Sequence, residues 1–249
     1  MAKAENKMSD EKTRYTRLKS IKDFGYDVDW MDLREKSVVV AGVGGLGMIT
    51  AEMLARCGIG KLFLFDRDVV DVVNLNRLGF HERHLGDSKV EVIEVRIQSM
   101  NPDVETIAHH GDIMLFENES RFEEALTDAD VCLMGVDNYP ARTFVNRKCM
   151  RLKTVLLDAG AARSGLSGHV HPIFPGINAC IQCTGIIEAS GERGEPCTAS
   201  LPTTMAILAG LQVQECLKIL LGFGNVVDYL TYNAITGTFR NLKTRRDEN

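Results

Sequence analysis

The segment GVGGLG (42–47) spaces its glycines as G-x-G-x-x-G, and the acidic Asp66 ends the next apolar run. Glycines let the backbone approach phosphate groups closely, and a helix that begins directly behind them supplies N–H donors and positive potential. An acidic side chain about 20 residues further on can accept hydrogen bonds from ribose hydroxyls. The pattern therefore predicts a nucleotide site formed by Gly42, Gly44, Gly45, Gly47 and Asp66. A glycine-rich turn without a ligand is the less favoured interpretation.

A second set of polar residues favours ATP over a nicotinamide dinucleotide, the main alternative ligand of such a turn. The set comprises Asn74, Arg77, Lys89, Asp137 and Asn138, each close to the end of an apolar run or the start of a helical pattern. The carboxyl ends of parallel strands meet at one crevice, so these side chains should converge there. Arg77 and Lys89 can neutralise the β- and γ-phosphate oxygens, and Asp137 can hold Mg²⁺. Taken singly, such a cation is usually solvated, and an Asp-Asn pair after a strand is often a helix cap.

The elements that position these residues follow from the apolar pattern. The expected strands are Ser37–Ala41, Lys61–Phe65, Val104–Ala108, Val131–Gly135 and Thr154–Leu157, with helical patterns from the glycine turn to Cys57 and at 88–100, 119–127 and 140–151. Strands that alternate with helices predict an α/β fold with a doubly wound, mostly parallel, Rossmann-like sheet. The alternating pattern at 163–174 predicts antiparallel strands that extend the sheet in its C-terminal half. Thr203–Leu221 predicts an apolar core or interface helix.

Length and composition bound the organisation of the chain. We expect a mobile N-terminal tail and short helix at 1–36, one α/β domain at 37–249, and a long functional loop at about 178–202. The chain has 29 Lys and Arg against 34 Asp and Glu, a net charge of -5, which argues against a nucleic-acid partner. No run approaches 18 apolar residues and the N-terminus lacks an apolar signal core, so neither a membrane partner nor secretion is expected.

The seven cysteines are odd in number and lie mostly in apolar segments. That usage favours free thiols in a reducing, cytoplasmic compartment over a disulfide framework. Only Cys180, Cys183 and Cys197 lie in polar, loop-like sequence. Cys197 precedes the expected helix start at 202–204, whose N-terminal potential would favour a thiolate, whereas two nearby glutamates oppose it.

The sequence resembles the ubiquitin-like modifier-activating enzymes and their bacterial sulfur-carrier adenylyltransferase relatives, the ThiF/MoeB group. The matching stretches are GVGGLG (42–47), LFLFDRDVVDVVNLNRLGF (62–80), GDSKVEV (86–92), NPDVE (101–105), VDN (136–138) and the Cys-x-x-Cys at 180 and 183. Within this group the sequence most resembles the subfamily that activates ubiquitin-fold modifier, from about Tyr15 to about Asn233. The most specific segments are AEMLARCGIGKLFLFD (51–66) and PCTASLPTTM (196–205).

The resemblance implies ATP-dependent adenylation of a modifier's C-terminal glycine carboxylate, followed by thioester formation on Cys197. It implies ATP contacts from Gly42, Gly44, Gly47, Asp66, Asn74, Arg77 and Lys89, with Mg²⁺ organised by Asp137. It also implies a homodimer in which Arg17 reaches the ATP site of the partner subunit, and a cognate conjugating enzyme as a further partner. From composition alone, Arg17 would be a solvated tail residue.

Two departures from the group's pattern matter. The group completes a Cys₄ zinc site with a second Cys-x-x-Cys near the C-terminus, whereas no cysteine follows Cys216 here. Cys180 and Cys183 are therefore expected to be half of a zinc site or its remnant, because two thiolates cannot close a tetrahedral site. The C-terminal extension that recruits the modifier and the conjugating enzyme in the resembled subfamily is also missing after 241–249.

Three alternative functions stay open. A sulfur-carrier adenylyltransferase stops at the acyl-adenylate and needs no thioester cysteine, so the context of Cys197 argues against it. An NAD-dependent oxidoreductase offers no role for Lys89 or Asp137. A catalytically inactive subunit is the third alternative. The intact set of Arg77, Lys89 and Asp137 argues against it, because an inactive subunit would not need these residues.

Overall fold

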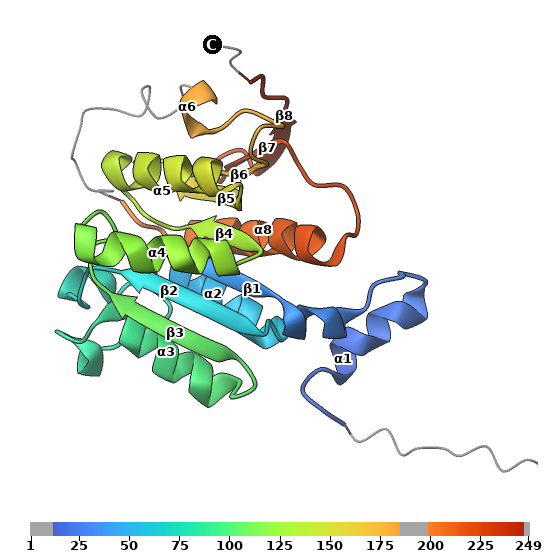
Figure 1. Ribbon diagram of the computed structural model, residues 1–249, viewed down its shortest axis with the longest axis horizontal. Helices are drawn as coiled ribbons and strands as arrows, with labels where there is room; N and C mark the ends of the chain where they lie inside the picture. Colours follow the sequence, from blue (N-terminus) through green and yellow to red (C-terminus); the bar gives the residue numbers. More distant parts are fainter. Residues whose placement is uncertain (1–11, 185–198, 247–249) are drawn as a thin grey trace, which may run out of the picture.

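The computed structural model describes residues 12–184 and 199–246. Within these residues, eight strands form one sheet in the order β3-β2-β1-β4-β5-β6-β7-β8 (Figure 1). The strands are β1 (Ser37–Ala41), β2 (Lys61–Asp66), β3 (Glu105–His110), β4 (Val131–Met134), β5 (Val155–Ala161), β6 (Ser167–Ile173), β7 (Tyr229–Asn233) and β8 (Thr238–Leu242). The first five in spatial order pair in parallel, and the last three are added antiparallel. The predicted doubly wound fold with an antiparallel extension is confirmed.

The central strands are apolar throughout because both faces of the sheet are covered. In β1, Val38 and Val40 pack into one core layer, and Val39 and Ala41 pack into the other. All four side chains are completely buried. A strand buried on both faces gives a continuous apolar run in the sequence, as SVVVA does at 37–41.

Helices cover the two faces in separate groups. The helices are α1 (Thr16–Lys19), α2 (Gly47–Cys57), α3 (Lys89–Met100), α4 (Phe116–Asp128), α5 (Tyr139–Leu152), α6 (Ile181–Thr184) and α8 (Pro202–Leu221), with short 3₁₀ turns η1 (Ser20–Phe24), η2 (Trp30–Glu35), η3 (Val72–Asn74) and η4 (Glu82–His84). Figure 1 shows α4 and α5 in front of the sheet and α2, α3 and α8 behind it. Gly58, with φ 89°, ends α2 in the left-handed conformation that glycine adopts without strain.

Helix α8 is a core helix of the sheet. By length and composition it is apolar enough to cross a membrane, with half of its most apolar window buried. Its Gln212 is completely buried and donates hydrogen bonds to the backbone carbonyls of Met134 (3.1 Å) and Leu157 (2.8 Å). A polar side chain satisfied by two strands of the sheet fixes α8 against that sheet, as the sequence predicted.

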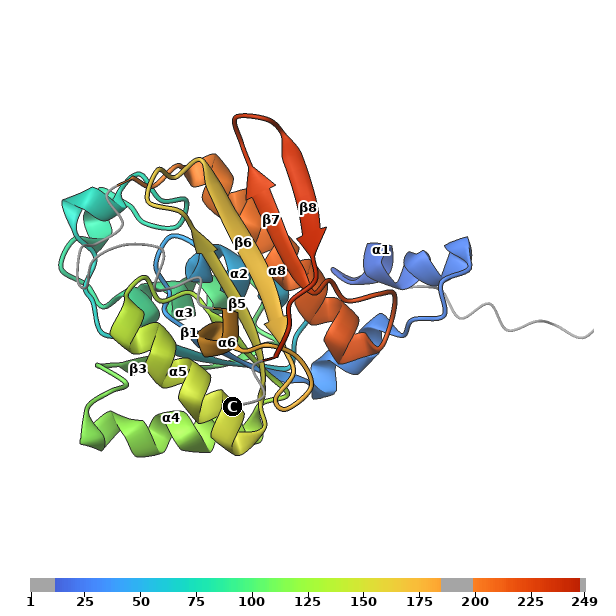
Figure 2. The same cartoon turned by 90° about the horizontal axis from the view of Figure 1, so that it is seen from above.

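The segment at 12–36 packs more closely on the domain than a mobile tail would. Leu33 is completely buried in the core, and Tyr15 is 4% exposed. The hydroxyl of Tyr15 donates to Asp103 at 3.0 Å. Apolar anchors this sparse give no periodic signal, so the sequence pattern placed the start of the folded part at Ser37. Figure 2 shows α1 projecting from the body of the protein.

Candidate active site

A cavity of about 340 Å³ opens at the carboxyl ends of β1, β2 and β4. Its volume lies in the range of small-ligand sites. Besides the glycine turn, its walls carry four cationic and four acidic side chains, namely Arg67, Arg77, Lys89, Arg142, Asp66, Asp68, Asp112 and Asp137. Most residues that the sequence assigned to a nucleotide therefore do converge on one cavity.

The glycine turn divides into residues that line the cavity and residues that shape it. Gly44 and Gly45 line the cavity, as does Gly42. Gly42 has φ 90°, and a Cβ there would lie 2.8 Å from the carbonyl carbon of Gly135. Gly47 is not part of the lining: a Cβ on it would lie 1.8 Å from the carbonyl oxygen of Gly42. Gly47 thus lets α2 pack against β1, and its contact with phosphate stays a prediction.

Arg77 lies directly over the glycine turn. A Cβ on Gly44 would be 3.1 Å from its Nη1, and a Cβ on Gly45 would be 3.4 Å from it. The Nε–H of Arg77 is buried and has no hydrogen-bond acceptor within the described residues. A buried donor without an acceptor costs about 1–3 kcal/mol, and an anionic oxygen bound over the turn would remove that cost. The arrangement fits a phosphate group held between Arg77 and the backbone of the turn.

Asp66 sits at the end of β2 with both carboxylate oxygens oriented by the backbone. Oδ2 accepts from the N–H of Val43 (2.8 Å), and Oδ1 accepts from the N–H of Asp68 (2.9 Å). Burial raises the pKa of Asp66, and the positive charge of Lys89 opposes that rise. Each oxygen keeps a lone pair for a further donor, which suits ribose hydroxyls.

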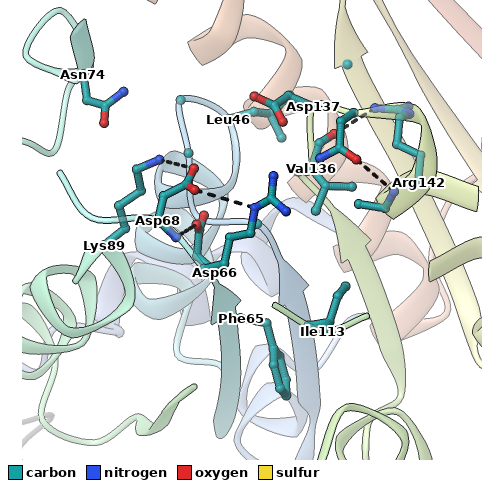
Figure 3. Close-up of a pocket in the computed structure, with 18 of the residues that line it drawn as sticks. Leu46, Phe65, Asp66, Asp68, Asn74, Lys89, Ile113, Val136, Asp137 and Arg142 are labelled. Carbon is teal, nitrogen blue, oxygen red and sulfur yellow. Dashed lines mark hydrogen bonds and ion pairs between the residues drawn. The ribbon is translucent and has the colours of Figure 1, made fainter. Parts of the chain in front are cut away.

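Lys89 begins α3 and is 6% exposed. Its Nζ lies 2.8 Å from Oδ2 of Asp68, and both residues line the cavity (Figure 3). The sequence pattern did not single out Asp68 or the ion pair of Arg67 and Asp112, whose Nη1 and Oδ2 atoms are 2.8 Å apart. The signal was present, because the segment FDRD continues past Asp66 at the end of the same strand.

The β4–α5 turn carries the predicted metal ligand. Asp137 is exposed on the cavity, and its carboxylate takes no hydrogen bond from the described part of the chain. Asn138 is the N-cap of α5, and its side chain accepts from the N–H of Ala141 at 3.0 Å. A free carboxylate beside phosphate-binding cations is the donor that Mg²⁺ takes in nucleotide sites. Asn138 therefore orders the turn that presents Asp137.

Asn74 lines the cavity but uses its side chain locally. It is 5% exposed, and its Oδ1 accepts from the N–H of Asp71 at 3.1 Å in a reciprocal capping arrangement. This cap holds η3, which carries the chain toward Arg77. The backbone N–H of Arg77 in turn donates to the carbonyl of Asn74 at 3.0 Å.

Other predicted site residues lie apart from the cavity or outside the described residues. Arg17 is on α1, which the contact of Tyr15 with Asp103 places near the amino ends of the strands. The Sγ atoms of Cys180 and Cys183 are 3.5 Å apart, and the described residues hold no cluster of three or more side chains suited to a metal. Cys197 falls in 185–198, outside the described residues.

Comparison with known proteins supports one family and one fold. The chain matches the ThiF family over residues 15–249. It is 42% identical to ubiquitin-like modifier-activating enzyme 5 of Bombyx mori, covering 90% of this chain and 61% of that protein. The enzyme of the same name from Dictyostelium discoideum is 40% identical, with coverages of 90% and 63%. The chain thus spans about three fifths of the length of these relatives.

Solved structures share the fold at low sequence identity. Escherichia coli MccB with succinimide superposes with a TM-score of 0.80 at 21% identity, over 96% of this chain and 73% of that one. The microcin C7 biosynthetic enzyme MccB in complex with N-formylated MccA gives 0.81 at 20% identity, with coverages of 95% and 73%. The mixed sheet with its antiparallel extension is therefore an established architecture.

Proposed function

Because the chain belongs to the ThiF family, we propose that it is an ATP-dependent activating enzyme for a ubiquitin-like protein, specifically ubiquitin-fold modifier. The reaction is adenylation of the modifier's C-terminal glycine carboxylate. One observation carries the proposal: Arg77, Lys89 and Asp137 converge on the cavity beside the glycine turn. The names of the relatives that are about 40% identical support a ubiquitin-like modifier as the substrate.

Each charged residue has a defined task in this reaction. The modifier's carboxylate oxygen attacks the α-phosphorus of ATP, and pyrophosphate leaves with the electron pair of the broken P–O bond. Arg77 and Lys89 lie where they can neutralise the phosphate oxygens that gain charge. Asp137 would hold Mg²⁺, which supplies further charge neutralisation on the phosphates. Asp66 would orient the nucleoside through the ribose.

We further propose that Cys197 then attacks the acyl-adenylate, releasing AMP and forming a thioester with the modifier. Ser200, three residues further along the chain, lines the cavity, and its carbonyl accepts from Asn76 at 3.0 Å. Three residues span at most about 11 Å, so the length of the chain limits how far Cys197 can be from Ser200. A thioester keeps the modifier's carboxyl group activated for transfer to a conjugating enzyme.

One experiment tests both steps. The chain is mixed with ubiquitin-fold modifier and ATP–Mg²⁺, and pyrophosphate release and a thiol-sensitive mass adduct are measured. Cys197→Ala should keep modifier-dependent ATP–pyrophosphate exchange and lose the adduct, whereas the buried Cys216→Ala control should keep both. Exchange without any adduct in the unmodified chain would favour a sulfur-carrier adenylyltransferase, the second candidate. An adduct that survives in Cys197→Ala would move the nucleophile to another cysteine, Cys183 first.

The position of Arg17 supports a homodimer that completes the site. Its helix α1 packs near the amino ends of the strands, whereas the cavity lies at their carboxyl ends. If Arg17 acts on ATP, it does so in a second subunit. Mixing Arg17→Ala with Asp137→Ala subunits should restore part of the activity that each homodimer lacks. Failure to complement, with subunit exchange verified, would return Arg17 to the role of a solvated residue.

Two further parts of the proposal concern the cellular compartment of the enzyme and a structural zinc ion. Cys57, Cys132, Cys149, Cys180 and Cys216 form no disulfide within the described residues, which supports a cytoplasmic enzyme. Cys180 and Cys183 would supply two of the four ligands of a structural zinc ion, and a zinc assay of the purified chain tests this.

A further inference from the structure

A buried ion pair lies behind the cavity wall that carries Asp137. Arg142, on the first turns of α5, donates through Nη2 to the carboxylate of Asp158 in β5. Their side chains are 12% and 4% exposed. The other oxygen of Asp158, Oδ2, lies 3.0 Å from Nε2 of His169 in β6. Neither Arg142 nor Asp158 was selected by the sequence, although Arg142 also lines the cavity.

The second arm of the guanidinium reaches the turn that presents Asp137. Nη1 of Arg142 donates to the carbonyl oxygen of Val136 at 3.2 Å and lies 3.4 Å from that of Ala159. Figure 3 shows Arg142 beside Val136 at the cavity wall. Val136 directly precedes Asp137, so this hydrogen bond fixes the peptide group next to the carboxylate. The Asn138 cap fixes the chain on the other side of Asp137.

Neighbouring residues leave space for the Arg142 guanidinium and favour its ion pair with Asp158. A Cβ on Gly160 would lie 3.1 Å from Nη1 of Arg142 and 3.4 Å from Cε1 of His169. Any larger residue at this position would therefore contact the guanidinium group of Arg142 too closely. Burial alone would raise the pKa of Asp158, but the charge of Arg142 and the hydrogen bond from His169 lower it below its usual range. The pair is therefore ionised at neutral pH. Apolar residues could fill this volume, but they could not bind the Val136 carbonyl.

We propose that Arg142 is a positioning residue that holds the Val136–Asp137 peptide so that the Asp137 carboxylate faces the cavity in the geometry Mg²⁺ needs. Asp158 serves as the fixed anchor of the guanidinium. Mg²⁺ demands near-ideal octahedral geometry, so a small displacement of one ligand weakens its binding. This inference rests on the proposed function, which assigns Mg²⁺ to Asp137.

The variant Arg142→Lys tests the positioning role. A lysine keeps the charge and can pair with Asp158, but a single ammonium lacks the rigid fork that reaches Asp158 and Val136 together. The thermal shift produced by a fixed ATP concentration is measured while Mg²⁺ is titrated, and ATP–pyrophosphate exchange is measured in parallel. We expect the Mg²⁺ concentration at half-maximal effect to rise about tenfold in both assays, which corresponds to about 1.4 kcal/mol. The KM for the modifier should change less than twofold.

Arg151→Lys is the matched control, since Arg151 is an ion-paired arginine on the same helix that contacts Glu123 away from the cavity. It should leave the Mg²⁺ midpoint unchanged. If Arg142→Lys fails to fold, Gly160→Ala displaces the guanidinium without removing a charge, and it should raise the Mg²⁺ midpoint at least threefold. An unchanged midpoint in the folded variant refutes the positioning role. Absence of any Mg²⁺ effect in the unmodified chain refutes the metal assignment itself, whereas absence of pyrophosphate release with intact Mg²⁺–ATP binding refutes only the proposed reaction.

Discussion

The two halves of the sheet use ionisable side chains in opposite ways. In the parallel half, Asp66 ends β2, Asp137 follows β4, and both line the cavity. Where the antiparallel half begins, Asp158 lies within β5, and His169 and His171 lie within β6. There Asp158 is paired in register with His171, and its carboxylate contacts His169 at 3.0 Å. Groups of the first kind line the cavity, and groups of the second kind face one another.

This difference predicts which charge removals lower activity and which lower stability. A charge at a strand end is partly solvated and is completed by the ligand, so its removal should cost mainly catalysis. A charge within a strand is completed by its neighbours in the fold, and its removal leaves a partner buried and unpaired. Arg142 belongs to both groups because one arm contacts Asp158 and the other contacts the turn before Asp137.

The largest expected effect is at Asp137. Asp137→Ala should lower modifier-dependent ATP–pyrophosphate exchange by about 10³-fold, because it removes the anchor of the ion that neutralises the leaving pyrophosphate. The melting temperature should stay within about 2 °C, since the carboxylate is exposed and makes no hydrogen bond within the described residues. Exchange close to that of the unmodified chain would remove Asp137 from the site.

Arg142→Ala should instead lower the free energy of unfolding by about 3–5 kcal/mol, because it leaves the Asp158 carboxylate buried without its arginine partner. Urea unfolding followed by circular dichroism measures the change. The exposed Arg151→Ala on the same helix should cost less than about 1 kcal/mol. Replacing both partners, as Arg142→Met with Asp158→Leu, should recover most of the stability while leaving Mg²⁺ binding weak. Recovery of both stability and Mg²⁺ binding would contradict the distinction between charges that serve stability and charges that serve activity.

His171 should make the antiparallel half sensitive to acid. Burial lowers its pKa to about 4, against the opposing charge of Asp158. The unfolded chain, with an ordinary histidine pKa near 6.5, binds a proton first, so the free energy of unfolding falls as the pH drops from about 6.5 toward 4. Between pH 7 and pH 5 the loss should be about 2 kcal/mol.

His171→Phe cannot take up a proton and should flatten the stability profile over that range, as measured by urea unfolding at several pH values. The control is His109→Phe, because His109 is partly exposed whereas His171 is buried. An equal pH slope in His171→Phe and the unmodified chain would assign the acid sensitivity to other groups.

The smallest expected effect is at Asn138, and it distinguishes a helix N-cap from a residue that contacts ATP. Asn138→Ala should cost about 1 kcal/mol of stability through the lost N-cap of α5, and Asn138→Asp should restore it. If the side chain acts only as a cap, the affinity for ATP in the absence of Mg²⁺ should be the same in all three proteins. Weaker ATP binding in Asn138→Ala would assign the side chain a direct contact as well.

Much of the fold and of the nucleotide half could be predicted from the sequence. The run at 37–41 and the glycine turn predicted a strand, a turn and a helix with the observed boundaries of β1. Residues at strand ends could be found because the chain topology alone brings those ends to one edge. The same rule would also have found Asp68 in the segment FDRD.

The antiparallel half was less predictable. The apolar pattern ended the fifth strand at Leu157, whereas β5 continues to Ala161 because β6 pairs with Asp158 and Gly160. A polar residue in a strand gives no local sign that a partner lies across the sheet. The role of Gly47 was hidden for a related reason, since a close backbone contact looks in sequence like a ligand-binding residue. For Asn138 the sequence left both a cap and a ligand contact open.

The sequence by itself determined the order of strands and helices up to the helix at 203–221, the burial of the central strands and most of the charges near the glycine turn. Periodicity and strand-end position are local properties of the chain, so they can be read without knowing what packs where. Only the tertiary structure decided that Arg142 bridges Asp158 and Val136, that Gly160 leaves room for this bridge, and that α1 lies away from the cavity. These features depend on distances between residues far apart in the chain, and those distances are set by how the helices pack on the sheet.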